Sequence, residues 1–504
     1  MQQTGEFTID SAYVFDRRNP LRWIWSHVWR YKILFSFALI MYVVSAVLQS
    51  TSRVLIGDAA NALVGSAGAN RLTQLTLAIL AALVLSALLN LAGSLSIETI
   101  AQRLSRDARD ELYLSLLGKS QTFHDRQRVG DIMARTTDDV QQLNVMINPG
   151  VLFLTDIALG LSVPMIYIAT VEWRLLLVPT IFVISYVLFA RVYMGMLNPV
   201  VGLQRFAFGQ LNAGLEETIS GIEIVKASAT EGFERKKFYE AAKRYRDAFA
   251  KQGRVEARYL PLFFFSLTAA LTFLHAIYLF DQGIVDFGEI VAVIGLVGVM
   301  QFPIIISLFA ITLVQLGLAS GTRILEMINA KASLSENHTC HQASVEGAIR
   351  FENVSFGYEH GDPILKNLNF KIAPGETVAI VGQTGAGKST LTELINRTYD
   401  VTEGRILVDG IDVREWNLDT LRSQISRIEQ DVFLFNRSLS ENIAFGAPDA
   451  SQERIEAAAK DAQAHEFILS FKDSYQTEVG ERGVTQEGTR QRNTLTLPTR
   501  KRDP

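Results

Sequence analysis

Six apolar stretches dominate the first two thirds of the chain. A transmembrane helix needs about 20 mainly apolar residues. Stretches of that length run near 33–55, 72–94, 149–171, 173–193, 260–280 and 287–309. The pattern of apolar and polar positions therefore predicts a bundle of six membrane-spanning helices.

A shorter amphipathic segment precedes the first span. Asn19 followed by Pro20 is typical of a helix start, with a capping side chain and a proline in the first turn. Apolar residues then recur at helical spacing, at Leu21, Ile24, Trp25, Val28 and Trp29, opposite Arg22, Ser26 and Arg30. The pattern favours an interfacial helix lying on the membrane over a soluble core helix. We expect no cleavable signal peptide, because the polar start lacks a short apolar core with a small-residue cleavage site.

Charge between the spans predicts the orientation. The segments between the second and third spans and between the fourth and fifth are long, helical in pattern and rich in Lys and Arg. The connection between the last two spans carries Asp281 and Asp286 without any Lys or Arg. The excess of positive charge on cytoplasmic loops places both termini and both long loops in the cytoplasm. We expect a multi-pass protein of the plasma (inner) membrane.

Few ionisable residues lie inside the spans. Asp156 in the third and His275 in the fifth are the clear cases. Such groups are costly in hydrocarbon and are candidates for lining a substrate path, although a hydrogen bond inside the bundle would explain either one. Pro303, in the last span, predicts a kink.

A phosphate-binding motif follows the spans. Gly382-Gln383-Thr384-Gly385-Ala386-Gly387-Lys388-Ser389 matches G-x-x-x-x-G-K-[ST] at every fixed position, between a β-rich run at 376–381 and a helical pattern at 390–395. Glycines allow successive backbone N–H groups to surround a polyphosphate, and the following helix adds its positive end. Lys388 can reach the β- and γ-phosphates, and Ser389 can coordinate Mg²⁺. A glycine-rich surface turn is the alternative.

Composition narrows the possible partners and sites of the protein. The chain has 504 residues, of which 48% are hydrophobic, and a net charge of −4, so it carries no overall basic footprint for nucleic acid. Its one cysteine, Cys340, excludes an intramolecular disulfide. His338 and His341 beside Cys340 suggest a metal site, but no fourth ligand is in view, so we expect the cluster to be incidental.

Six spans and a phosphate loop on one polypeptide resemble an ABC exporter half-transporter, of the multidrug and lipid exporter type. The stretches 123–135 and 216–226 resemble the two intracellular loops of that family, which serve as coupling helices that dock on nucleotide-binding domains. The resemblance implies a membrane α-helical six-span bundle followed by a partial α/β P-loop nucleotide-binding domain. The expected boundaries are a transmembrane domain at 1–325, a linker at 326–345 and an incomplete nucleotide-binding domain at 346–504.

The resemblance also implies a nucleotide site. The stretch 351–358 resembles the opening strand of the family's nucleotide-binding domain, so Tyr358 is expected to stack on adenine. Gln430 matches the Q-loop glutamine that contacts Mg²⁺, and 477–483 resembles the exporter-specific segment that touches the coupling helices. ATP and Mg²⁺ are the implied cofactors, with Ser389 and Gln430 near the metal. The candidate binding residues are Tyr358, Gly382, Gln383, Thr384, Gly385, Ala386, Gly387, Lys388, Ser389, Thr390 and Gln430.

The chain departs from the family pattern after Gly483. The stretch 484–492 stands where the signature L-S-G-G-Q is expected, and neither an apolar strand ending in Asp-Glu nor a later histidine follows. The stretch 406–409 imitates the Asp-Glu strand, but Gly410 follows it, so it predicts an ordinary hairpin strand. No catalytic set is complete, and we expect nucleotide binding without efficient hydrolysis. A frameshift or premature stop is the simplest interpretation, and a shortened regulatory form is the alternative.

Two functional hypotheses remain open. The first is an ATP-driven exporter subunit that pairs with a second half-transporter chain, identical or paralogous, and exports an unidentified substrate across the lipid bilayer. The second is a non-hydrolysing nucleotide-binding membrane regulator or an inactive frameshift product. Six spans exclude a soluble kinase-like P-loop enzyme.

Overall fold

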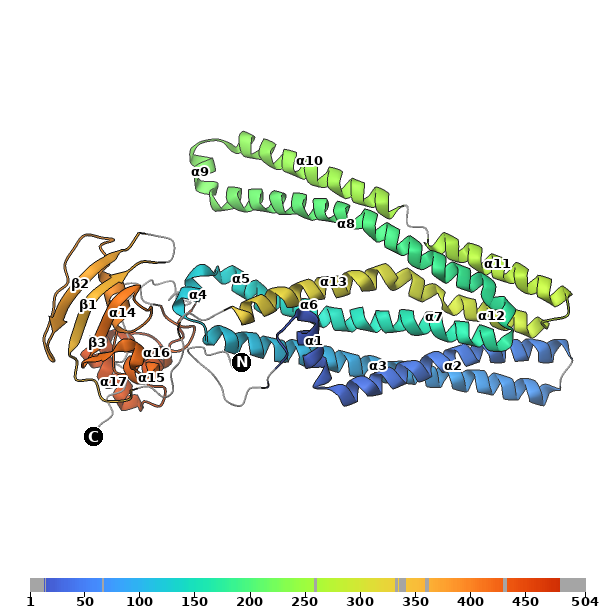
Figure 1. The fold of residues 1–504 in the computed structure, drawn as a ribbon, viewed down its shortest axis with the longest axis horizontal. Helices are drawn as coiled ribbons and strands as arrows, with labels where there is room; N and C mark the ends of the chain where they lie inside the picture. The colour runs from blue at the N-terminus through green and yellow to red at the C-terminus, as the bar shows by residue number, and fades with distance from the viewer. Residues whose placement is uncertain are drawn as a thin grey trace. The chain divides into compact units, whose positions relative to one another are not determined.

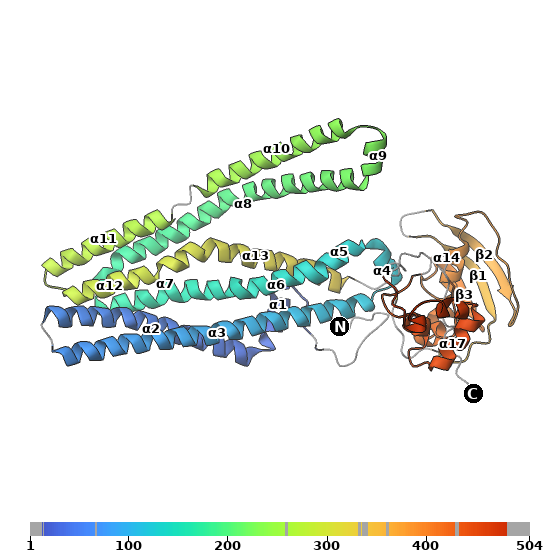
Figure 2. The ribbon, with the colours of Figure 1, turned by 180° about the vertical axis from the view of Figure 1, so that it is seen from behind.

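A computed structural model describes residues 13, 15–65, 68–257, 261–330, 334, 341–358, 362–428 and 433–480. The chain divides into two compact units (Figures 1 and 2). The helical unit comprises residues 13–112 and 133–329, and the mixed unit comprises residues 1–12, 113–132 and 330–504. Each unit has hydrophobic clusters of its own.

Long helices form the helical unit and confirm the six predicted spans. Six helical stretches among the described residues are long and apolar enough to cross a membrane. They are built from α2 (Lys32–Val64), α3 (Ala69–Leu117), α7 (Leu152–Val171), α8 (Leu177–Ser220), α11 (Pro261–Asp281), α12 (Phe287–Val299) and α13 (Gln301–Asn329). The predicted kink lies at Met300, between α12 and α13. Pro303 has no N–H to donate to the carbonyl four residues earlier, which is that of Val299.

The charged segments between the spans are helical, as their pattern predicts. Between α3 and α7 the chain forms α4 (Gln121–Arg126), α5 (Val129–Ala134) and α6 (Val140–Val145), with π-helical turns at Arg135–Asp139 and Met146–Val151. A 3₁₀ turn at Trp173–Leu176 joins α7 to α8. Beyond α8 come the short α9 (Ile222–Ala227) and α10 (Glu231–Glu256), and α10 runs back beside α8 (Figures 1 and 2).

The N-terminal helix begins where predicted, and it is partly buried. In α1 (Pro20–Trp29) the Asn19 side chain accepts a hydrogen bond from the Arg22 N–H at 2.8 Å. Of the apolar residues at helical spacing, Ile24 and Val28 are buried, whereas Leu21, Trp25 and Trp29 are exposed. The packed side is completed by Trp23 and His27, which both contact the Glu111 carboxylate of α3.

One carboxylate on α3 attaches this helix to the bundle. Glu111 accepts hydrogen bonds from Arg17 Nε at 2.6 Å and Trp23 Nε1 at 2.8 Å, and His27 Nε2 lies 3.1 Å away. A buried carboxylate requires several such partners. Polar groups therefore decide which side of α1 is buried, which the spacing of apolar residues cannot reveal.

In the helical unit, α2 and α12 cross closely at two glycines. Gly57 and Gly288 face each other, and a Cβ at either glycine would overlap the carbonyl oxygen of the other. Asn61 accepts a hydrogen bond from the Gly288 N–H at 2.6 Å beside them. Small residues at such a crossing allow the two backbones to approach.

An antiparallel sheet with strand order β2-β1-β3-β4 forms the centre of the mixed unit. Its strands are β1 (Ile349–Phe356), β2 (Leu365–Ile372), β3 (Glu403–Val408) and β4 (Ile411–Asp412). α14 (Lys388–Ile395) packs on this sheet through Leu391 and Leu394. A second, smaller core involves α16 (Leu439–Ile443), α17 (Gln452–Asp461) and α18 (His465–Leu469), and α15 (Leu418–Arg422) packs on the first core.

The stretch 406–409 belongs to a hairpin, as predicted. β3 pairs with β4 across Asp409 and Gly410, which have φ values of 52° and 80°. Two consecutive residues at positive φ are typical of the tight turns that join antiparallel strands. The Asp409 carboxylate also accepts hydrogen bonds from the N–H groups of Glu346, Gly347 and Ala348, at 2.7–3.0 Å. This aspartate therefore fixes the entry to β1.

The strand predicted before the phosphate loop is wrong. Residues 376–383 form no strand, and the Val381 side chain is 91% exposed. Val378 and Ile380 are exposed as well. A central strand of a parallel sheet is held by hydrogen bonds to both neighbours and covered on both faces. The described residues supply no paired strand beside this segment, so its β propensity alone does not form one.

Candidate functional site

Two glycines in left-handed conformations shape the loop before α14. Gly385 and Gly387 have φ values of 86° and 84°. A Cβ at Gly387 would lie 2.8 Å from side-chain carbons of both Ile364 and Leu365, closer than real contacts allow. The glycine pattern of the motif therefore corresponds to a backbone path that other residues would strain. The path ends at Gly387, the N-cap of α14.

Lys388 folds back over this loop. Its Nζ donates hydrogen bonds to the carbonyl oxygens of Gly382 at 3.0 Å and Gln383 at 2.8 Å. Residues 382–386 and Ser389 are exposed, whereas Thr390 is buried. The ammonium group and the first N–H groups of α14 therefore lie together at an accessible surface. Such an arrangement suits a phosphate chain.

Tyr358 lies beside α14 at the end of β1. Its hydroxyl donates to Glu393 Oε2 at 3.1 Å and lies 3.4 Å from Thr390 Oγ1. Its ring meets the ring of Tyr399 edge-on, with centroids 5.4 Å apart. Partial burial raises the pKa of the Tyr358 phenol, so the group is neutral at physiological pH. The structure thus brings Tyr358 next to the helix that carries Lys388, Ser389 and Thr390.

Tyr399 connects this cluster to α4. Its hydroxyl donates to Asp125 Oδ2 at 2.6 Å, and Gln121 donates to the other oxygen of that carboxylate at 2.8 Å. Burial and the Asp125 carboxylate both raise the pKa of the Tyr399 phenol, which therefore remains a hydrogen-bond donor. Sequence reasoning missed Tyr399. Its only signal was an aromatic residue shortly after the helix of the phosphate loop.

The remaining sequence candidates of the mixed unit are only partly described. Gln430 and the stretch 484–492 lie outside the described residues. Of the stretch 477–483, Glu478 pairs with Ser438, and the Val479 N–H donates to the Arg437 carbonyl at 3.0 Å. These segments border a polar pocket of about 390 Å³, lined by Asn436, Arg437, Ser438, Ser440, Glu441, Gln476 and Glu478.

The cluster around Cys340 is only partly described by the structure. His338 and Cys340 lie outside the described residues. The His341 ring instead meets Trp416 edge-on at 4.7 Å. Among the residues that the structure describes, no group of three or more His, Cys, Asp or Glu side chains is arranged to hold a metal ion.

The two ionisable candidates inside the spans lie on different helices. Asp156 on α7 is partly buried near Tyr42 of α2, whose hydroxyl lies 2.9 Å from Ser94 Oγ. His275 on α11 has a buried Nδ1 with no hydrogen-bond partner among the described residues. Among the described residues, no side-chain hydrogen bond is found for Asp156 or for the Nδ1 of His275.

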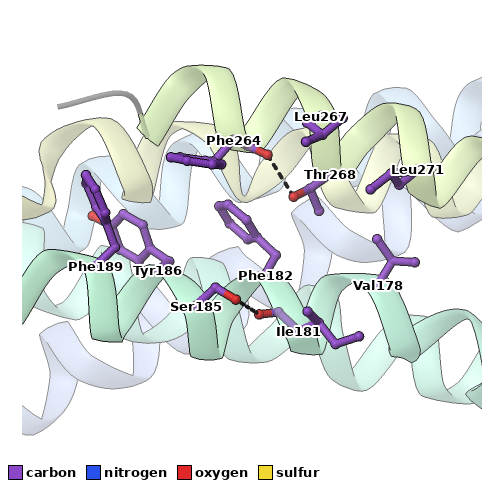
Figure 3. A pocket seen from close by; sticks show the side chains of 10 residues that line it. All are labelled: Val178, Ile181, Phe182, Ser185, Tyr186, Phe189, Phe264, Leu267, Thr268 and Leu271. Atoms are coloured by element: carbon purple, nitrogen blue, oxygen red, sulfur yellow. Dashed lines mark hydrogen bonds between the residues drawn. The ribbon is translucent and has the colours of Figure 1, made fainter. Parts of the chain in front are cut away.

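A cavity of about 390 Å³ lies between α8 and α11 (Figure 3). Most of its wall is apolar, and four aromatic rings contribute to it. Its lining residues are Val178, Ile181, Phe182, Ser185, Tyr186, Phe189, Phe264, Leu267, Thr268 and Leu271. The volume and the few polar groups are typical of small-molecule sites.

Family models match both units. The model of the ABC transporter transmembrane region covers residues 35–304, and the ABC transporter model covers residues 365–496. The chain belongs to the ABC transporter family. It therefore joins an ABC exporter membrane region and an ATP-binding domain in one multi-pass membrane polypeptide.

The relatives of this ABC transporter chain include exporters. It is 32% identical over 392 residues to YgaD of Bacillus subtilis, provisionally named a multidrug export ATP-binding/permease protein, covering 77% of this chain and 68% of the relative. It is 30% identical to the multidrug resistance-like ATP-binding protein MdlA of Escherichia coli, covering 77% and 66%. A bacterial Atm1-family ABC exporter solved with ATP bound superposes with a TM-score of 0.72 and 26% identity, over 88% of this chain and 80% of the other. The chain thus spans about two thirds of the length of these two sequence relatives.

Proposed function

We propose that this chain is one subunit of an ATP-driven exporter. The observation that carries the proposal is the loop at 382–389, with its two left-handed glycines and Lys388 at the start of α14, on the same polypeptide as six membrane spans. A soluble kinase-like P-loop enzyme would not need the spans. The loop would bind ATP, and the spans would move a substrate across the bilayer.

The residues of the loop fit a magnesium nucleotide. Gly382, Gln383, Thr384, Gly385, Ala386 and Gly387 would offer N–H groups to the phosphates, Lys388 would add a positive charge, and Thr390 would support the start of α14. Ser389, exposed at that start, would hold Mg²⁺ together with Gln430. The bound metal would neutralise phosphate charge. Tyr358 would present its ring to adenine.

Stacking on Tyr358 can be tested by changing only the ring. Tyr358→Phe keeps the ring and removes the hydroxyl, whereas Tyr358→Leu removes the ring. Because aromatic stacking on a base contributes about 1–3 kcal/mol, the leucine variant should bind a fluorescent ATP analogue at least about fivefold more weakly. The phenylalanine variant should bind like the unmodified chain. Equal binding by all three proteins would remove Tyr358 from the site.

We propose that α4 is a coupling element. The supporting observation is the hydrogen bond from Tyr399 to Asp125, which joins the helical segment 113–132 to the nucleotide site through the Tyr358 ring.

A double-mutant cycle tests this contact. Asp125 is exposed, so the hydrogen bond from a neutral phenol should contribute about 1 kcal/mol to the free energy of unfolding. Tyr399→Phe and Asp125→Asn should each lower stability, and the double variant should be no less stable than the worse single variant. Urea unfolding monitored by fluorescence measures the coupling. Fully additive effects would show that the two residues do not interact.

We further propose that a second half-transporter chain, identical or paralogous, completes the exporter. The hairpin formed by α8, α9 and α10 supports this, because it exposes several large apolar side chains outside the apolar part of the span. Examples are Leu203, Phe206, Leu215, Ile219 and Ile224. Exposed apolar patches of this kind are typical of interaction surfaces. We place the hairpin, the mixed unit and both termini in the cytoplasm, and the spans in the plasma membrane.

The competing function is a nucleotide-binding membrane regulator that does not hydrolyse ATP. The departure of the stretch 484–492 from the family signature favours it. Binding of a fluorescent ATP analogue and release of phosphate, measured on the same chain in lipid nanodiscs, distinguish the two functions. An exporter subunit shows both, and a regulator shows binding alone. Failure to bind nucleotide would contradict both proposals.

A further inference from the structure

We propose that a basic cluster at one end of the spans of α2 and α3 binds the phosphate of an anionic phospholipid. The cluster consists of Arg30 and Tyr31 in the turn before α2, Lys32 at its start, and Arg103 and Arg106 on α3. In the proposed orientation these residues meet the cytoplasmic leaflet. The inference concerns the lipid around the chain and requires neither nucleotide binding nor export.

Tyr31 holds the basic cluster together. Its hydroxyl donates to Asp107 Oδ2 at 2.7 Å, and the guanidinium carbon of Arg103 lies 5.1 Å from the centroid of its ring. Arg30 donates to the same Asp107 oxygen at 3.0 Å, and Arg106 donates twice to Oδ1, at 2.8 and 3.1 Å. Both oxygens of this buried carboxylate are therefore occupied.

The basic cluster contains four cations, and two of them have no carboxylate partner. Asp107 is shared as described, and Asp110 also attracts Arg106. Among the residues that the structure describes, no ion pair is found for Lys32 or Arg103. Both residues are exposed. These two cations are therefore available to an anion from outside the chain.

Neighbouring side chains place the basic cluster at the level of the lipid headgroups. Lys32 comes directly before the apolar run of the first span, whose first residue, Ile33, is 83% exposed. Trp25 and Trp29 on α1 are exposed, and the Trp25 ring meets Phe35 of the span edge-on, with centroids 5.7 Å apart. Exposed tryptophans beside the start of a span are typical of the membrane–water interface.

An anionic phospholipid fits this arrangement. Arginine binds phosphate oxygens through paired N–H groups, and Lys32 would add a point charge. The acyl chains would follow the exposed apolar side chains of the first span, such as Ile33, Phe37 and Ile40. The choline of phosphatidylcholine would be repelled by the cluster, whereas phosphatidylglycerol has no such positive group. Basic residues at the cytoplasmic end of a span attract anionic lipids for this reason.

Native mass spectrometry of the whole chain tests the site, with phosphatidylglycerol and phosphatidylcholine of identical acyl chains titrated separately. The unmodified chain should bind the first phosphatidylglycerol at least about fivefold more tightly than the first phosphatidylcholine. Arg103→Gln and Lys32→Gln should each weaken binding of phosphatidylglycerol about fivefold and leave that of phosphatidylcholine unchanged. Lys243→Gln removes an equal charge at an exposed position of α10, so it should bind both lipids like the unmodified chain.

Two further readouts separate a lipid site from a structural role and from a free-anion site. Arg103→Lys keeps the positive charge and should retain most of the preference for phosphatidylglycerol. Inorganic phosphate in excess should not displace the lipid, because it lacks the acyl chains. Equal affinities of the unmodified chain for the two lipids, an equal loss in Lys243→Gln, or displacement by inorganic phosphate would overturn the proposal.

Discussion

Lys388→Ala is expected to weaken ATP binding by about a hundredfold or more. Charge-assisted hydrogen bonds contribute about 1.5–3 kcal/mol each, and one lysine can make two of them to a triphosphate. The substitution also removes the bonds from Nζ to Gly382 and Gln383, which hold the loop in its present form. Titration of the chain in nanodiscs with a fluorescent ATP analogue measures the effect.

The matched control for this variant is Lys460→Ala. Lys460 carries the same charge at an exposed position of α17, so removing it changes the net charge equally. Circular dichroism should show the same helix content in both variants. Undiminished binding by Lys388→Ala, with Lys460→Ala normal, would mean that the loop at 382–389 does not bind the nucleotide.

Gly288→Leu is expected to prevent normal folding of the helical unit. The crossing of α2 and α12 leaves no room for a Cβ at this position, and the nearest atom is a backbone oxygen that cannot move alone. Overpacking by a few methyl groups costs about 1–3 kcal/mol where side chains can adjust. Here two helices would have to separate, so the cost should exceed that range. The melting temperature in detergent should fall by about ten degrees or more, or the protein should not be recovered as a folded species.

Gly298→Leu provides the comparison on the same helix. A Cβ at Gly298 would meet nothing within 4 Å, so the same change in helix propensity is introduced without a collision. Its melting temperature should stay within a few degrees of that of the unmodified chain. Equal melting temperatures for the two variants would show that the α2–α12 contact does not limit the stability of the unit.

Features set by short spacing could be predicted from the sequence. The spans follow from runs of about 20 apolar residues, the start of α1 from Asn19 and Pro20, and the turn after β3 from Asp409 and Gly410. The phosphate loop follows from its glycines. In each case the deciding interactions join residues that are close in the chain.

Features that depend on distant partners could not be predicted. Glu111 decides which side of α1 is buried although it lies on α3, and Asp125 meets Tyr399 from 274 positions away. The segment at 376–381 has the composition of a strand, but a strand exists only beside another strand.

The unbroken course of α3 has a mechanical consequence. This helix contains 49 residues, so at 1.5 Å per residue it is about 74 Å long, more than twice the hydrocarbon thickness of a bilayer. It acts as a stiff rod with its charged end outside the lipid. A tilt of about 5° at one tip would swing the other by about 6 Å. Small adjustments among the spans would thereby be amplified into displacements large enough to exchange side-chain contacts at the charged tip of α3.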